Sequence, residues 1–126
     1  MKKKILIVED DVLNMKLFND LLQAQGYETF QDKNGSDVLE LASKTRLDLI
    51  LMDIKLPKVS GLDLIKCLKN DRNLMRIPTV AVTAFAMSND EERIKEGGFD
   101  GYITKPILIT SFLVTVAKFL SISHTN

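Results

Sequence analysis

Short apolar runs alternate five times with longer segments of helical periodicity along this chain. The runs are nearly continuous, which is typical of strands buried on both faces of a sheet. Repeated units of strand and helix close on a parallel sheet with helices on both faces. The sequence therefore predicts an α/β fold with a doubly wound parallel sheet, whose strands cover residues 5–8, 27–31, 49–53, 79–82 and 102–105.

The helical segments have recognisable faces and ends. The first helix carries Leu13, Leu17 and Leu21 at four-residue spacing, beside Phe18 and Leu22, and should end near Gly26. Cys67 is expected to pack near the inner face of the third helix. The inner face of the last helix is expected to hold Phe112, Leu113, Val116, Ala117 and Leu120.

The fourth helical segment, 85–97, differs from the others because it has few apolar anchors, chiefly Ile94. Ser88 and Glu91 stand at capping-box spacing near its start. A weakly anchored helix moves more readily than a well-packed one.

A chain of 126 residues, 45% of them apolar, suffices for one domain, and we expect a single domain over residues 1–126 with no effector domain. Seventeen basic and seventeen acidic side chains give no net charge, which argues against binding to nucleic acid or anionic lipid. Lys2, Lys3 and Lys4 form the only basic run and are interpreted as a solvated leader.

The apolar run 5–8 is too short for a secretory signal or a membrane span. The single cysteine cannot form an internal disulfide, which suits a reducing compartment. We therefore expect a soluble cytoplasmic protein without membrane insertion.

Polar residues stand where four of the predicted strands end. They are Glu9 and Asp10 after the first strand, Asp53 at the end of the third, Thr83 after the fourth and Lys105 at the end of the fifth. The carboxyl ends of parallel strands meet at one edge of the sheet, so these side chains should lie together. Each also has a structural interpretation, as a helix cap, a strand end or a surface lysine. We assign only Asp11 to the capping role, and His124 to a solvated tail.

Two carboxylates about 4 Å apart repel by roughly 4 kcal/mol at an effective dielectric near 20. Lys105 offsets part of that repulsion, and a divalent cation would offset the rest. Carboxylate oxygens without nearby His or Cys favour Mg²⁺. A metal, a lysine and a hydroxyl around one carboxylate can stabilise a phosphoryl group in transfer, with Asp53 as nucleophile and Thr83 as hydrogen-bond donor.

Four motifs make the chain resemble the receiver domain of two-component response regulators over nearly its whole length. They are VEDD at 8–11, LILMDIKLPKVSG at 49–61, VTA at 82–84 and YITKP at 102–106. The resemblance implies a flavodoxin-like (βα)5 sheet with strand order 2-1-3-4-5. It also implies phosphorylation at Asp53, a cis peptide bond before Pro106, and metal binding by Glu9, Asp10, Asp53 and the backbone carbonyl of Lys55.

Two longer stretches, 14–29 and 81–107, resemble more narrowly the single-domain receivers of alphaproteobacterial cell-cycle control. This implies a signalling switch in cell division and polarity, not a turnover enzyme. The implied partners are histidine kinases and phosphatases or a histidine phosphotransfer protein, and partner kinases are expected to recruit the protein to the cell poles. We expect a monomer or a weak dimer.

Signalling is expected to pass through Thr83 and Tyr102. Phosphorylated Asp53 would draw the Thr83 hydroxyl toward it, and the Tyr102 ring would enter the vacated space while residues 85–87 shift. Since no effector domain is expected, another protein must detect the change. The candidate docking residues are Ile107, Ile109 and Phe119.

Three other classes of protein share parts of this pattern. A flavodoxin-like electron carrier has the same sheet, but Glu9, Asp10 and Asp11 would repel the flavin phosphate. A haloacid dehalogenase phosphohydrolase needs a second acid two residues after its nucleophile, where this chain has Lys55. A non-phosphorylated pseudo-receiver would act as a binding module alone.

Overall fold

The computed structural model describes residues 2–84 and 90–122. In chain order the strands are β1 (Lys4–Val8), β2 (Glu28–Asp32), β3 (Leu49–Met52), β4 (Thr79–Thr83) and β5 (Gly101–Thr104). The helices are α1 (Val12–Ala24), α2 (Val38–Lys44), α3 (Gly61–Asn70), α4 (Asp90–Gly97) and α5 (Ile109–Ile122). The predicted alternation is confirmed, with strand ends that differ by one residue.

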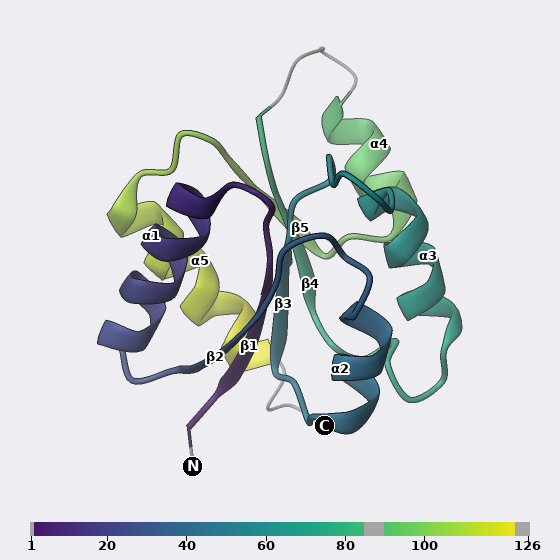
Figure 1. The fold of residues 1–126 in the computed structure, drawn as a ribbon, viewed down its shortest axis with the longest axis horizontal. Coiled ribbons are helices and arrows are strands. Elements are labelled where there is room, and N and C mark those ends of the chain that lie inside the picture. The colour runs from purple at the N-terminus through teal and green to yellow at the C-terminus, as the bar shows by residue number, and fades with distance from the viewer. Residues whose placement is uncertain (1, 85–89, 123–126) are drawn as a thin grey trace.

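The strands form one parallel sheet in the order β2-β1-β3-β4-β5. Parallel neighbours need a crossover connection, and helices provide it here. Figure 1 shows α1 and α5 on one face of the sheet and α2, α3 and α4 on the other. The flavodoxin-like order implied by the resemblance is therefore confirmed.

The central strands bury side chains on both faces. In β1, Ile5 and Ile7 pack toward α1 and α5, whereas Leu6 and Val8 pack toward the opposite layer. All four are at most 1% exposed. Burial on both faces explains why these strands read as continuous apolar runs.

The first helix buries only part of the apolar set predicted for it. The side chains that it buries are Met15, Phe18 and Leu22. Phe18 stacks on Phe112 of α5 with ring centroids 5.3 Å apart, and this contact favours the observed rotation of the helix. Leu21 is partly buried against the same core, whereas Leu13 and Leu17 are 78% and 39% exposed.

Three further packing predictions are wrong. Cys67 is exposed on α3, and Ala117 is exposed on α5. Phe119, predicted as a docking residue, is only 8% exposed because it packs over Gly101. An ideal Cβ at Gly101 would stand 2.5 Å from Cζ of Phe119, so the ring occupies space that only glycine leaves open.

Local predictions at the helix ends are confirmed. Asp11 caps α1 by accepting a hydrogen bond from the Asn14 amide at 2.9 Å. Gly26 follows α1 with a φ of 90°, a conformation that favours glycine. Ile94 anchors α4 and is 1% exposed.

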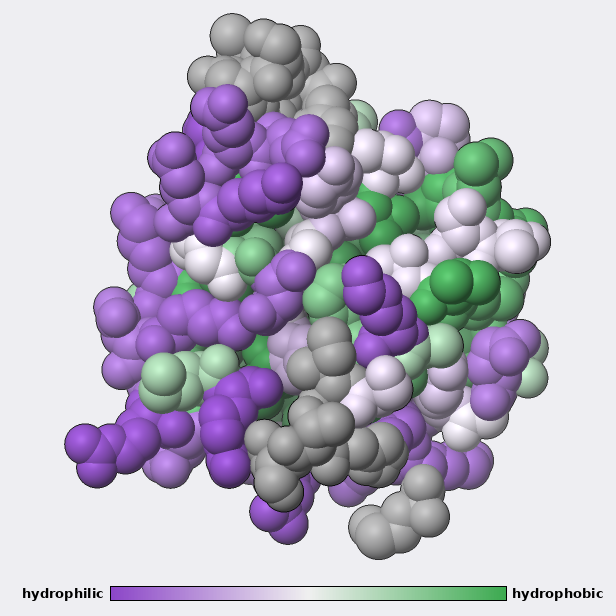
Figure 2. Space-filling view, turned by 180° about the vertical axis from the view of Figure 1, so that it is seen from behind, coloured by the Kyte–Doolittle hydropathy of each residue, from purple (hydrophilic) through white to green (hydrophobic). Residues whose placement is uncertain are grey.

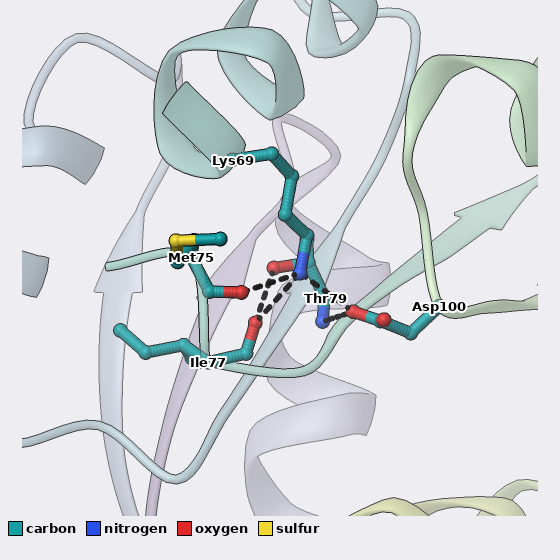
Figure 3. A network of polar contacts seen from close by, with 5 residues as sticks. All are labelled: Lys69, Met75, Ile77, Thr79 and Asp100. Atoms are coloured by element: carbon teal, nitrogen blue, oxygen red, sulfur yellow. Dashed lines mark hydrogen bonds and ion pairs between the residues drawn. The ribbon is translucent and has the colours of Figure 1, made fainter. Parts of the chain in front are cut away.

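A polar clamp fixes the loop before β4 (Figure 3). The Lys69 ammonium donates to the carbonyl oxygens of Met75 and Ile77 at 3.2 and 3.3 Å and pairs with Asp100 at 2.9 Å. The same carboxylate oxygen of Asp100 accepts a hydrogen bond from the Thr79 amide at 2.8 Å. This clamp ties the α3–β4 loop to the start of β5, at the edge of the sheet where the strands begin.

Some sequence predictions fall on residues outside the described part of the chain, namely Phe85, Ala86, Met87, Ser88 and His124. None of the helices within residues 2–84 and 90–122 is both long and apolar enough to cross a membrane.

Candidate functional site

The polar residues that follow the strands meet at one edge of the sheet, as predicted. Backbone hydrogen bonds fix the chain at this edge: the Asp53 amide donates to the Val8 carbonyl at 2.9 Å, and the Lys105 amide donates to the Thr83 carbonyl at 3.0 Å. These bonds continue the pairing of neighbouring strands one residue beyond the sheet. The site therefore rests on rigid elements, not on loop conformation alone.

Three carboxylates converge within this site. Glu9, Asp10 and Asp53 each place one oxygen so that the three oxygens lie within 4.8 Å of one another. Glu9 and Asp53 are buried, at 2% and 7% exposure, whereas Asp10 is exposed. The cluster is thus open to solvent on the side of Asp10.

One ammonium group opposes the cluster. Nζ of Lys105 lies 2.9 Å from Oδ2 of Asp53 and 2.7 Å from Oε1 of Glu9. Burial alone would lower the pKa of Lys105, but its bonds to Glu9 and Asp53 outweigh that effect and raise it. Lys105 is therefore held in its charged form between two acids.

The ionised form of Glu9 is disfavoured by burial. Burial raises the pKa of its carboxyl above the ordinary value, although the contact with Lys105 opposes the shift. Oε1 of Glu9 already has one positive neighbour, the Lys105 ammonium at 2.7 Å. Three converging carboxylates that face this one ammonium group still leave a surplus of negative charge, which a bound cation would offset.

The donor set fits Mg²⁺. All three side chains offer hard oxygen atoms, and Mg²⁺ is usually held by one or two carboxylates while it keeps several waters. The exposed side of the cluster at Asp10 leaves room for such waters. The cluster therefore has both the donor atoms and the open side that a Mg²⁺ site requires.

The β3–α3 loop is folded tightly against the site. The Lys55 amide donates to Oδ1 of Asp53 at 3.0 Å, so Asp53 is fixed through both of its oxygens. Gly61 makes the tight turn possible, because a Cβ there would stand 2.7 Å from Cα of Ile54. The sequence marked Gly61 as a turn residue, but it did not reveal this close backbone approach.

Two further residues support the site and were missed by sequence reasoning. The Asp11 amide donates to Oε2 of Glu9 at 3.1 Å and so helps to orient that carboxylate. Asp32, buried at the end of β2, accepts hydrogen bonds from the amides of Asn34, Gly35 and Asp37. Its signal in the sequence was a carboxylate two residues before the Asn34-Gly35 pair, which is the pattern of an Asx turn.

The proposed switch residues lie on neighbouring strands. Thr83 is 4% exposed at the end of β4, and Tyr102 is half-buried on β5. The Tyr102 hydroxyl donates a hydrogen bond to the carboxylate of Glu91 in α4. This hydrogen bond lowers the pKa of Glu91 and raises the pKa of Tyr102. Glu91 also pairs with Lys95 at 3.3 Å. Tyr102 is therefore tied to α4 in this conformation.

The peptide bond between Lys105 and Pro106 is cis, as the resemblance implied. The structure thus brings together Glu9, Asp10, Asp53 and Lys105, with Thr83 on the adjacent strand end and Lys55 in the loop that covers Asp53.

Comparison with known proteins agrees with this geometry. The family model described as the response regulator receiver domain matches residues 5–117. The chain belongs to the response regulator receiver family. A curated relative, the polar-differentiation response regulator DivK of Brucella anthropi, is 56% identical over 120 residues, which cover 95% of this chain and 98% of that protein.

Two solved receiver domains extend the comparison. One belongs to a sensor histidine kinase of Pseudomonas aeruginosa and holds a magnesium ion in its active-site cleft; it is 27% identical, with a TM-score of 0.88 and coverage of 96% and 99% of the two chains. The other belongs to a Saccharomyces cerevisiae response regulator and was crystallised with its histidine phosphotransfer protein; it is 25% identical, with a TM-score of 0.87 and coverage of 95% and 90%.

This receiver domain is a DivK-like phosphorylation switch and not a turnover enzyme. Membership of the receiver family rules out the flavodoxin-like electron carrier and the haloacid dehalogenase phosphohydrolase as alternatives. Receiver domains interact with histidine kinases and phosphotransfer proteins, which defines the general class of partner.

Proposed function

We propose that this receiver domain accepts a phosphoryl group on Asp53 in a Mg²⁺-dependent reaction and signals through contacts with other proteins. The observation that carries the proposal is the position of Lys105, whose ammonium bridges Asp53 and Glu9 inside a cluster of three carboxylates. This arrangement provides both a nucleophilic carboxylate and the positive charge that a transferred phosphoryl group needs.

In the proposed reaction, a carboxylate oxygen of Asp53 attacks the phosphorus of a phosphohistidine. The new O–P bond forms as the P–N bond breaks, and the imidazole leaves with the electron pair of that bond. Lys105 stabilises the charge on the phosphoryl oxygens, since its ammonium already lies 2.9 Å from Asp53. Thr83 donates a hydrogen bond to the product.

Glu9, Asp10, Asp53 and the backbone carbonyl of Lys55 would hold the Mg²⁺ ion. The ion supplies positive charge that neutralises the phosphoryl oxygens in the transition state. The surplus of negative charge in a cluster of three carboxylates that faces one ammonium group supports this assignment.

The phosphoryl donor is proposed to be a histidine kinase or a histidine phosphotransfer protein that docks beside the site. Both α1 and α5 follow strands that end at this edge, and apolar side chains are exposed near the start of each helix: Val12 at 70%, Leu13 at 78%, Leu108 at 73% and Ile109 at 53%. Figure 2 shows apolar side chains gathered over the side of the molecule that α5 covers. An apolar surface next to the nucleophile suits a protein donor.

This surface revises the docking set expected from the sequence. Ile109 belongs to it, whereas Ile107 is half-buried against the core and Phe119 is buried.

Output is proposed to pass from Thr83 to Tyr102. Movement of the Thr83 hydroxyl toward phosphorylated Asp53 would release Tyr102 from Glu91 and so change the surface between α4 and β5. A change of only a few kcal/mol in the free-energy difference between the two conformations converts such an element from mostly inactive to mostly active, as expected for a phosphorylation switch. The similarity to DivK supports a role in cell division and polarity, with a cytoplasmic monomer or weak dimer recruited to the cell poles by kinases.

The test compares Asp53→Asn with the unaltered chain in transfer of labelled phosphate from a phosphorylated kinase. We expect acid-labile labelling of the unaltered chain with Mg²⁺, and none with EDTA or in Asp53→Asn. Asp63→Asn is the matched control, since Asp63 is an exposed carboxylate on α3, and it should label normally. Full labelling of Asp53→Asn would refute the acceptor, and absence of labelling in every variant would favour a pseudo-receiver.

A further inference from the structure

A hollow lies at the edge of the sheet opposite the carboxylate cluster, where the strands begin. The chain segments that line it are at the lower end of the molecule in Figure 1. Its volume is about 980 Å³, and three segments line it: residues 2–4, 42–48 and 71–78. Six of the lining side chains are basic, namely Lys2, Lys3, Lys4, Lys44, Arg46 and Arg76. Only two, Asp48 and Asp71, are acidic.

The two acids offset only part of this charge, and neither forms an ion pair with a basic side chain of the hollow within the described residues; their carboxylates are hydrogen-bonded to the backbone instead. Asp48 accepts a hydrogen bond from the Lys4 amide at 2.8 Å, and Asp71 accepts one from the Asn73 amide at 2.8 Å. Of the six basic side chains, only Lys44 forms an ion pair within the described part of the chain, an exposed contact with Glu40. Five cations therefore share one concave surface without an acidic partner.

The walls of the hollow are fixed in place. Lys4 and Asp48 exchange hydrogen bonds in both directions, which fixes segment 2–4 against segment 42–48. Arg76 stands between Met75 and Ile77, whose carbonyl oxygens are both held by Lys69 in the clamp of Figure 3. The cations are thus presented by ordered backbone, which lowers the entropic cost of binding an anion.

The lining identifies the class of ligand. Among the described residues, the lining contains no aromatic side chain on which a nucleic-acid base could stack. Its apolar members are buried, apart from Ile77, which is half-buried, so they offer little surface for insertion into a membrane. Two arginines suit bidentate binding of phosphate oxygens, and lysines add point charges. We propose that this hollow binds a compact polyphosphate anion, either inorganic or the phosphate chain of a nucleotide.

Sequence reasoning interpreted Lys2, Lys3 and Lys4 as a solvated leader because no other basic residue adjoins them in the chain. The fold brings Arg46 and Arg76 to the same surface. The hollow lies at the edge of the sheet away from Asp53, so its ligand would bind independently of phosphorylation.

The test is calorimetric titration of the untagged chain with inorganic triphosphate, ATP, orthophosphate and anionic phosphatidylglycerol vesicles, in EDTA so that the carboxylate cluster is not involved. We expect triphosphate to bind and the affinity to fall steeply between about 50 and 200 mM salt, as in other phosphate-binding surfaces. Equal affinity for triphosphate and ATP would show that the phosphate chain alone is bound, and tighter binding of ATP would identify a nucleotide.

The double variant Arg46→Ser with Arg76→Ser should weaken triphosphate binding by about tenfold or more, since two charge-assisted contacts to phosphate oxygens are lost. The control double variant Lys33→Ser with Lys66→Ser removes the same charge from exposed positions outside the hollow and should change the affinity less than twofold. Asp53→Asn should bind triphosphate normally. Equal weakening in both double variants, absence of triphosphate binding, or binding of vesicles alone would overturn the proposal.

Discussion

Nζ of Lys105 lies 2.9 Å from Oδ2 of Asp53, although 52 residues separate them in the chain. The contact exists because β3 and β5 flank β4 and all three strands end at the same edge. The same ammonium also contacts Glu9, so one side chain balances two buried acids. This balance makes the site sensitive to any change in charge, and the following predictions depend on it.

Glu9→Gln should raise the thermal stability of the metal-free protein at neutral pH. Burial raises the pKa of Glu9 in the folded state, so the ionised side chain disfavours folding above that pKa. The stability that protonated Glu9 contributes is fully present below its unfolded pKa and is lost as the pH rises through the folded pKa. The melting temperatures of the variant and the parent, measured from acid to neutral pH, should therefore differ more as the pH rises. A variant less stable than the parent at neutral pH would contradict this explanation.

Lys105→Ala should lower the free energy of unfolding of the metal-free protein by about 1–3 kcal/mol, because it leaves two buried carboxylates without a positive partner. Mg²⁺ should then stabilise the variant more than it stabilises the parent, since the ion replaces the missing charge. Denaturant titrations with and without Mg²⁺ measure both effects. Lys66→Ala, on the exposed face of α3, is the control and should change neither.

Gly101→Ala should destabilise the fold by about 1–3 kcal/mol, because its Cβ would collide with the ring of Phe119. Adding Phe119→Leu should recover part of the loss by making room for the methyl group. Chemical denaturation of the two single variants and the double variant gives the coupling energy. Additive losses would show that the two residues do not share this space.

Leu13→Ser combined with Leu108→Ser should slow phosphoryl transfer from a protein donor by about tenfold, because two exposed apolar contacts of the proposed docking surface are lost. Phosphorylation by a small donor such as acetyl phosphate should be unchanged, since neither side chain belongs to the carboxylate cluster. Leu39→Ser on α2 removes a leucine that is 38% exposed on the opposite face of the sheet and serves as control. Equal slowing with both donors would show that the two leucines affect the phosphoryl-transfer step itself, and would contradict their role in docking.

The sheet and the carboxylate cluster could be predicted because both follow from strand order. Once the apolar runs were assigned to parallel strands, Glu9, Asp53 and Lys105 had to meet at one edge. The face that a helix packs against the sheet could not be predicted from strand order. Leucine spacing favoured Leu13, but the stacking of Phe18 on Phe112 decided the face of α1.

Packing against the sheet hid other features from the sequence. Phe119 is buried because Gly101, far away in the chain, leaves space beneath it. The basic hollow was not visible either, since Arg46 and Arg76 reach Lys3 only through the fold. Such contacts depend on tertiary register, which local patterns do not encode.

The identity of the phosphorylated residue tests the account most directly. Borohydride reduces an aspartyl phosphate to homoserine, so reductive trapping followed by peptide mass spectrometry locates the acceptor. After incubation with acetyl phosphate and Mg²⁺, homoserine should replace aspartate at position 53, and EDTA should prevent the conversion. Conversion at another carboxylate, or conversion at Asp53 that proceeds equally in EDTA, would contradict the proposed Mg²⁺-dependent site.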